Sequence, residues 1–309
     1  MQKLLAIAFL LLAAPLAPAA IINVEFKFTP FIGNPATDDH VTSIAGHAQV
    51  FLNGVPYGPE QELKEDQVMV LLEGHEVSPT VWLPINSAGA LVRKGKNKFR
   101  LEFTPNDLTK SYHAQLRWDS VTDQVTDDFA GSSGKSTNQT DAGMDDRPNV
   151  KGKVVLEHEF MADFAHDLPW HHYPAVTSLT DEDKAKIVAL LKKRADWFQP
   201  DFAGVYKAIE DNESFKAEDV RKAHCLEEAY KSGVRIPAPT AGDLNFLTTG
   251  GPEVVVSRKG TSLFGLDEKS LAAVKDEEAQ MCAGMVLATV YPQRMGFVRQ
   301  PEGNWEAVD

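Results

Sequence analysis

The sequence predicts a two-domain protein in which an all-β antiparallel sandwich is followed by an α+β domain. Residues 20–165 contain short stretches of alternating hydrophobicity separated by Gly, Pro and polar residues, a pattern typical of an antiparallel sandwich. After Pro174 the hydrophobic spacing becomes that of an amphipathic helix, and apolar strand-like segments return near the C-terminus. We therefore expect a linker over 166–178 and, over 179–309, helices packed on a curved antiparallel sheet.

Residues 1–19 have the pattern of a secretory signal peptide. A basic Lys3 precedes an apolar run over 4–12, and the Ala-Pro-Ala of residues 17–19 follows as a small-residue cleavage site. An apolar run of this length is too short to span a bilayer, so we expect no transmembrane segment after cleavage. The mature chain is expected to be periplasmic or secreted, in a bacterium.

The excess of acidic residues argues against nucleic acids and anionic membranes as partners. The chain has 31 Lys and Arg against 44 Asp and Glu, a formal net charge of −13. Nucleic acids and anionic membranes bind basic patches, and none is visible, so a nucleic-acid partner is not expected. A small molecule, a glycan or a protein partner in the envelope remains. Acidic charge is also compatible with cations, so a divalent metal stays open as a cofactor although none is required.

Cys225 and Cys282 are the only cysteines. In an oxidising compartment an isolated pair predicts one disulfide, and two buried thiols are the alternative. Neither cysteine lies in a motif that would lower its pKa, so a catalytic thiol is not expected.

The N-terminal half contains several predicted strands. Residues 21–28 alternate strictly between apolar and polar side chains, as a half-buried strand does. The Asn53-Gly54 pair marks a tight hairpin turn. Further strands are expected over 47–54, 67–74, 80–84, 97–105, 112–120 and 153–164, the last of which should pair back into the sandwich.

Residues 120–150 change in composition. They are rich in Asp, Ser, Thr and Gly and nearly lack apolar residues, which predicts a long exposed loop, disordered or flexible in part. The aspartates suggest calcium, but the ordered Asp-x-Asp-x-Asp-Gly loop with its closing Glu is missing. We therefore expect a solvated loop here.

Helical spacing begins after Thr180, a suitable N-cap followed by three acidic residues in the first turn. Pro200 ends this first helix. Later elements are expected as helices over 202–209 and 216–231, strands over 252–260, 261–267 and 279–292, and a hairpin over 294–309 that turns near 301–303.

Two resemblances follow from these segments. DEDKAKIVALLKKRADWF (181–198) and MGFVRQPEGNWEAVD (295–309) resemble the NTF2-like superfamily, which implies a curved sheet against helices with a conical pocket. AQVFLNGVPYG (48–58) and VRKGKNKFRLEF (92–103) resemble an accessory sandwich of exported proteins, either immunoglobulin-like or galactose-binding-like. Such folds carry both enzymes and binding domains, so neither resemblance implies a reaction.

The stretch HEFMADFAHDLPWHHYP (158–174) holds four of the nine histidines. A metal ion needs three or four donors within about 2.0–2.6 Å of one point. On an extended strand His158 is too far from the later donors, at ~3.3 Å per residue. The donors that a loop at Leu168-Pro169 brings together are His166, Asp167, His171 and His172, which form the candidate metal site.

The same stretch has two other interpretations. In the first, Trp170 and Tyr173 are buried at the seam between the domains, with the histidines hydrogen-bonded at its edge. In the second, Trp170 or Tyr173 stacks on a small ligand or a glycan and Asp167 binds its hydroxyl groups.

No nucleotide-binding, serine-hydrolase or HExxH zinc motif occurs in the chain. We therefore expect a non-catalytic binding or interaction protein with its ligand at the domain seam or in the C-terminal pocket. The alternative is a metal-dependent hydrolase or lyase that uses the histidine cluster at 166–172.

Overall fold

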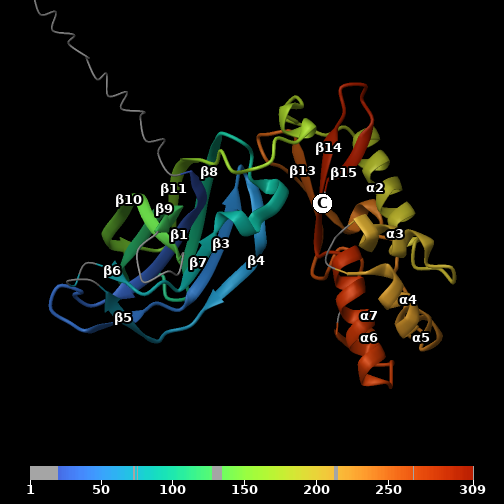
Figure 1. The fold of residues 1–309 in the computed structure, drawn as a ribbon, viewed down its shortest axis with the longest axis horizontal. Helices are drawn as coiled ribbons and strands as arrows, with labels where there is room; N and C mark the ends of the chain where they lie inside the picture. Colours follow the sequence, from blue (N-terminus) through green and yellow to red (C-terminus); the bar gives the residue numbers. More distant parts are fainter. Residues whose placement is uncertain are drawn as a thin grey trace, which may run out of the picture.

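A computed structural model of the chain describes residues 20–71, 74, 76–126, 134–211, 215–266 and 268–308. The signal peptide expected over 1–19 lies outside these residues. Antiparallel sheets dominate the structure, and helices α2 to α7 lie in its C-terminal half (Figure 1). This mixture of antiparallel sheets followed by helices and a further sheet agrees with the expected β plus α+β architecture.

Two antiparallel sheets form the N-terminal half. In the first sheet the strand order is β10-β9-β1-β2-β5-β6, with β7 paired to β1. Its strands are β1 (Ile21–Ile32), β2 (His40–Ser43), β5 (Gln67–Leu71), β6 (Glu76–Val77), β7 (Val81–Pro84), β9 (Ser111–Thr126) and β10 (Gly134–Lys151). The second sheet has the order β11-β8-β3-β4 and contains β3 (Gly46–Leu52), β4 (Val55–Leu63), β8 (Lys96–Pro105) and β11 (Val154–Met161).

The inner faces of the two sheets share one hydrophobic core. Phe26 of the first sheet stacks on Phe99 of the second, with ring centroids 3.9 Å apart. The hairpin predicted at Asn53-Gly54 is confirmed, because both residues have positive φ and connect β3 to β4. The strand predicted over 153–164 is also confirmed, as β11 pairs antiparallel with β8.

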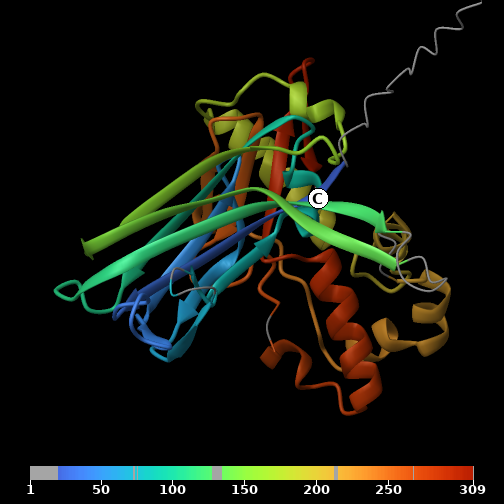
Figure 2. The same ribbon diagram turned by 60° about the vertical axis from the view of Figure 1, so that its left-hand side comes forward.

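The loop predicted over 120–150 is wrong for the described residues. β9 and β10 pair antiparallel along most of their length and form two long adjacent strands (Figure 2). The segment is polar because β10 is an edge strand whose described side chains mostly face solvent. It is a strand because its backbone pairs with β9, which composition does not indicate. A Cβ at Gly143 would lie 2.4 Å from the Trp118 ring, so the absence of a side chain there lets the strands approach. Residues 127–133 lie outside the described residues.

The C-terminal half packs helices on a four-stranded antiparallel sheet of order β12-β13-β14-β15. The helices are α2 (Asp181–Ala195), α3 (Ala203–Asp211), α4 (Ala217–Ala223), α5 (Cys225–Lys231), α6 (Glu268–Leu271) and α7 (Glu277–Val290). The strands are β12 (Leu244–Thr248), β13 (Glu253–Arg258), β14 (Arg294–Arg299) and β15 (Trp305–Val308), and the short 3-10 helices of the chain are η1 (Ile85–Leu91), η2 (Pro169–His172) and η3 (Ala241–Asp243). Within the described ranges, no helix combines the length and apolar character needed to cross a bilayer.

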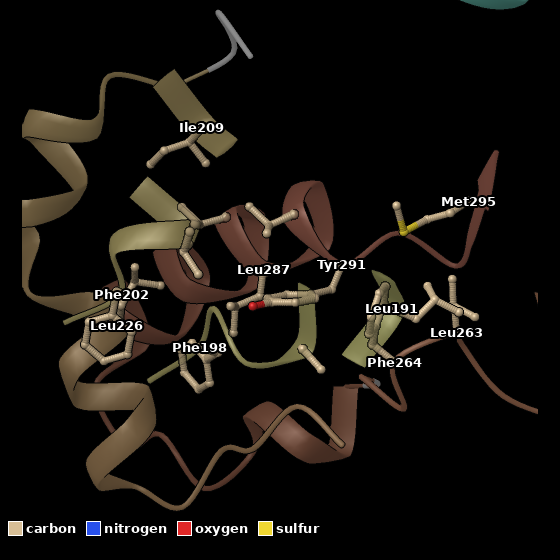
Figure 3. Packing of buried hydrophobic residues seen from close by; sticks show 14 of the residues in the cluster. Leu191, Phe198, Phe202, Ile209, Leu226, Leu263, Phe264, Leu287, Tyr291 and Met295 are labelled. Carbon is tan, nitrogen blue, oxygen red and sulfur yellow. The ribbon is translucent and has the colours of Figure 1, made fainter. Parts of the chain in front are cut away.

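The core of this half lies between the helices and one face of the sheet. Phe198, Phe202 and Leu226 gather beside Leu287 of α7 and Tyr291, which follows the helix (Figure 3). Burial raises the pKa of the Tyr291 hydroxyl above its usual value, so this phenol stays neutral. The remaining core side chains include Val254, Val256, Met295, Phe297 and Trp305 from the sheet.

The predicted disulfide is confirmed. Cys225 at the start of α5 is bonded to Cys282 in α7, with Cα atoms 6.0 Å apart. The two residues are 57 apart in sequence, so the bond closes a long loop and restricts the unfolded chain. It joins two helices that pack on the same core.

Three expectations for this half are corrected. Most of the strand expected over 279–292 lies in helix α7, which ends at Val290, and Ala283, Val286, Leu287 and Val290 are buried at helical spacing. A short run that is apolar all round does not show its period, which is why it resembled a buried strand. No strand covers the described part of 261–267, and β13 pairs instead with β12 and β14. The helix expected over 216–231 is interrupted at His224, whose φ of 51° is left-handed.

Asp183 ties the start of α2 to the end of the sheet. Thr180 is the N-cap, as predicted, and Asp183 completes a capping box with it. The other oxygen of Asp183 accepts a hydrogen bond of 2.9 Å from Trp305 Nε1. Arg299 Nη2 lies 3.2 Å from the same carboxylate. Burial alone would raise the pKa of Asp183, but the hydrogen bonds from Trp305 and Thr180 outweigh it and lower the pKa below its usual value.

This lowered pKa predicts a pH-dependent contribution to stability. A carboxyl group whose pKa is lower in the folded state stabilises the fold above its unfolded pKa of about 3.9 and loses that effect as the pH falls through the folded value. Asp183→Asn should therefore cost about 1–3 kcal/mol in the free energy of unfolding at pH 7, and the difference from wild type should close at low pH. Urea unfolding between pH 7 and pH 3 measures it.

Asp181→Asn is the matched control, because Asp181 lies in the same first turn with a fully exposed side chain. Its cost should stay below about 1 kcal/mol. Equal losses in the two variants, or a loss in Asp183→Asn that does not change with pH, would contradict the assignment.

Candidate functional site

A cavity of about 570 Å³ lies between the N-terminal sheets and the C-terminal sheet. Its size is typical of sites for small ligands, which range over about 300–1,000 Å³. β4, η1, η2 and the β13–β15 strands line it, together with the end of α7 and the segment that follows it. The lining side chains used below are Val55, Pro56, Tyr57, Ser87, Ala88, Leu91, Trp170, Glu253, Val255, Arg294, Gly296 and Val308.

The N-terminal wall consists of β4 and η1. β4 is an edge strand of its sheet, and Pro56 and Pro59 lack the N–H groups that would pair with a further strand. The two prolines therefore oppose the pairing of a further strand along this edge. η1 follows directly after Pro84, and its Ala88 and Leu91 extend the apolar surface.

The C-terminal wall is the face of the sheet that points away from the helices. Val254 and Val256 pack in the helical core, so the alternation of a strand places Glu253 and Val255 on the opposite face. Gly296 of β14 continues this wall opposite Val308 of β15, its register partner. One sheet thus separates the core from the cavity.

An ion pair joins the two walls. Arg93 Nη2 lies 2.6 Å from Glu253 Oε1 and 2.8 Å from Oε2. Glu253 is only 2% exposed, and the Thr249 hydroxyl also donates to its carboxylate at 3.3 Å. A Cβ at Gly251 would lie within 2.8 Å of both partners, so a glycine is needed beside the pair.

Further contacts hold the same seam. Gly54 of the β3–β4 turn approaches the Thr249 carbonyl so closely that a Cβ on Gly54 would lie 2.1 Å from its oxygen. Arg294 donates a hydrogen bond to the Gly58 carbonyl on β4. Val176 N donates to Gly251 O at 2.9 Å, so the segment that connects the two halves is fixed to the loop before β13. Several independent contacts therefore place the cavity walls.

His171 is a structural group at this seam. Leu168 N donates to Nδ1 at 3.4 Å, so Nε2 carries the proton and donates to Ala90 O at 2.9 Å. Burial lowers the pKa of His171, assisted by the charge of Arg93, and keeps the ring neutral. Both ring nitrogens are therefore occupied by backbone groups, and neither is available to a metal ion.

The other members of the proposed metal site do not complete a ligand set. His172 Nε2 pairs with Asp167 Oδ1 at 2.6 Å on the surface. His166 instead lines a separate hollow beside Ile22 and Phe164. Over the described ranges, no three His, Cys, Asp or Glu side chains are grouped so that they could hold an ion. The structure therefore does not bring His166, Asp167, His171 and His172 together as one ligand set.

Of the residues predicted to bind a ligand, one lines the cavity. Trp170 does so, with its ring edge-on to His171 at a centroid distance of 4.2 Å. Asp167 and Tyr173 are not among the lining residues. The Asp167 carboxylate pairs with His172 instead. Sequence analysis missed Arg93 and Glu253. Glu253 could have been noticed, because it begins the apolar run Glu-Val-Val-Val and a charge in a buried strand needs a partner.

Comparisons of the chain with models of protein families, with curated proteins and with solved structures find no match. The NTF2-like and sandwich resemblances of the two halves therefore stay predictions. The chemistry of a ligand for the cavity is therefore inferred from its lining residues.

The Arg93–Glu253 pair predicts a large energetic coupling. Glu253→Gln should lower the free energy of unfolding by about 2–4 kcal/mol, because it leaves Arg93 beside a buried neutral group. Adding Arg93→Met should recover part of this loss, with a coupling of about 1–3 kcal/mol in a double-mutant cycle. Urea unfolding of the four proteins gives the value.

The exposed pair Lys96–Glu159 is the matched control for this cycle, with an N–O distance of 2.8 Å and both side chains more than half exposed. Its coupling should be much smaller than that of Arg93–Glu253, because solvent screens an exposed ion pair. A coupling at Arg93–Glu253 no larger than that of the control would show that the pair does not hold the seam.

Gly54 and Gly58 allow a test of the close approach at the seam. Both have positive φ, so an alanine strains the backbone at either position. Only at Gly54 would the new Cβ clash with another segment, whereas nothing lies within 4 Å of a Cβ at Gly58. Gly54→Ala should therefore lower the thermal midpoint more than Gly58→Ala and increase the radius of gyration in small-angle X-ray scattering. Equal behaviour of the two variants would contradict this contact.

Proposed function

We propose that this protein is an exported, non-catalytic binding protein whose ligand occupies the seam cavity. The observation that carries the proposal is a cavity of ligand size with an apolar lining, held open between walls that polar contacts join. Sites of this kind bind small molecules through apolar contacts, while a few placed polar groups fix the orientation.

The lining favours a mostly apolar ligand with one anionic or acceptor group. Glu253 and Arg294 are the charged residues of the lining, as far as the chain is described. Glu253 is paired with Arg93, so Arg294 is the charge that can face a ligand. Burial lowers the pKa of Arg294, but a guanidinium keeps its charge at neutral pH. The Tyr57 and Ser87 hydroxyls, 3.3 Å apart, add polar contacts at the N-terminal wall.

Two groups near the cavity could act as a catalytic base, and both are occupied. The Glu253 carboxylate accepts hydrogen bonds from Arg93 and Thr249. His171 uses both ring nitrogens for backbone groups. A general base must reach a substrate proton with an available lone pair, so the arrangement favours binding over catalysis.

The proposed location is the periplasm or the medium outside the cell. The signal-like residues 1–19 and the Cys225–Cys282 bond support it, because structural disulfides persist in oxidising compartments.

A dye of matching chemistry tests the cavity. 8-Anilinonaphthalene-1-sulfonate has an apolar ring system and one anionic group, and it should bind saturably at one site per chain with increased fluorescence. Val255→Trp and Ser87→Trp place an indole in the cavity from its two walls and should each weaken binding about tenfold or more, because apolar contact area is lost. Ser87 is exposed, so its substitution should leave folding intact.

Val155→Trp is the control, since Val155 is an exposed strand position outside the cavity. It should bind the dye as wild type does. The proposal fails if the dye does not bind, or if folded Ser87→Trp binds as strongly as Val155→Trp.

A further inference from the structure

A second hollow lies on the outer face of the first sheet and shares no lining residue with the seam cavity. Phe26 and Phe28 of β1 point into the core, so Glu25 and Lys27 point outward. Lys27 Nζ lies 3.0 Å from Glu25 Oε2 and 2.9 Å from Asp119 Oδ2 on β9. Burial lowers the pKa of Lys27, but the two carboxylates outweigh it and raise the pKa overall, so the ammonium stays charged.

Lys27 and Asp119 form part of the lining of a hollow of about 420 Å³, and Glu25 lies beside it. Arg117 of β9 lies beside Lys27 across the strands, and it donates to Glu76 and, at 2.7 Å, to Val77 O. One wall comes from the β5–β6 region and the other from β10. The lining residues are Lys27, Leu71, Glu76, Pro79, Arg117, Trp118, Asp119, Ala142, Gly143 and Met144.

An irregularity in β10 faces Asp119. The pairing of β10 with β9 shifts register between Thr140 and Gly143, so β10 has an extra residue opposite this carboxylate. Bulges commonly re-aim side chains or end pairing beside sites. β10, which forms one wall of the hollow, therefore bends beside Asp119.

Among the described residues, one oxygen of Asp119 lacks a hydrogen-bond donor. Asp119 is only 6% exposed, its Oδ2 accepts from Lys27, and its Oδ1 has no partner in the described part of the chain. A buried acceptor without a donor is costly, and native structures seldom keep one without a reason. Because Oδ1 is itself covered, a ligand hydroxyl reaches it only after a neighbouring side chain moves aside.

An exposed indole borders the same cluster. Trp82 of β7 is 58% exposed and lies opposite Lys27 in the register of β1 and β7. Its Nε1 donates to Glu25 Oε2 at 3.3 Å, which fixes the ring beside the charged groups. An exposed tryptophan offers a broad apolar surface next to a polar rim, whereas most tryptophans are largely buried.

We infer that this outer face is a saccharide-binding site, with Trp82 as the stacking surface and Lys27, Asp119 and Glu76 as partners for hydroxyl groups. The cluster contains three carboxylates and two cations, so a cationic ligand would meet Lys27 and Arg117 and an anionic one would meet the carboxylates. A neutral ligand with hydroxyls both donates and accepts, which suits adjacent donors and acceptors. Its apolar ring face suits an exposed indole.

This site is independent of the seam cavity, because the two share no lining residue. Both ligands can therefore bind the same molecule. The test of one site does not decide the other.

Titration calorimetry and saturation-transfer NMR with glucose, galactose, mannose, N-acetylglucosamine and their β-1,4-linked disaccharides test the inference on the full mature chain. We expect at least one sugar to bind saturably with a Kd of about 1 mM or below and to change tryptophan fluorescence. Trp82→Ala should weaken that binding about tenfold, and Trp82→Tyr should retain most of it. Asp119→Asn should weaken it about as much, because a charged acceptor is lost.

Trp170→Phe is the control, because it alters a tryptophan of the seam cavity and should leave sugar affinity unchanged. Trp82→Ala should in turn leave dye binding at the seam unchanged. If Asp119→Asn does not fold, Trp82→Ala decides, since an exposed side chain is removed without loss of the core. The inference is overturned if no sugar of the panel binds, or if folded Trp82→Ala binds the sugar as wild type does.

Discussion

The two halves meet at a buried ion pair between Arg93 and Glu253, and the seam cavity lies beside it. Glu253 starts a strand whose neighbouring side chains enter the helical core, so its own side chain must leave on the opposite face. A buried carboxylate there needs a partner, and the N-terminal half supplies Arg93. The walls meet at this polar contact. The apolar side chains of the two walls line the seam cavity beside it and do not merge the cores of the two halves.

The two proposed sites differ in the physics of recognition. At the seam, apolar walls dominate and Arg294 supplies the charge that faces inward, so binding there relies on removing apolar surface from water. On the outer face of the first sheet, a network of ion pairs holds Lys27 and Asp119 in place beside exposed Trp82. At this proposed site, recognition relies on hydrogen bonds to these charged groups and on stacking against Trp82.

The candidate site was only partly accessible to sequence reasoning. Trp170 could be predicted, because an aromatic residue after Pro169 in a linker is well placed to enter a seam. The metal site could not be judged by spacing, since the groups that occupy His171 are the Leu168 amide and the Ala90 carbonyl, the latter distant in sequence. Arg93 and Glu253 are 160 residues apart, so only the folded chain brings them together.

The sequence by itself determined the local elements: the period-2 strands, the Asn53-Gly54 turn, the Thr180 cap and the pairing of the two cysteines. These depend on neighbours within a few residues, or on there being a single partner. Tertiary structure decided the state of 134–151 and 279–292. The first is a strand because β9 offers its backbone along most of its length, and the second is a helix up to Val290 because its buried residues meet a helical core. Long-range pairing and packing outweigh weak local preference in both segments.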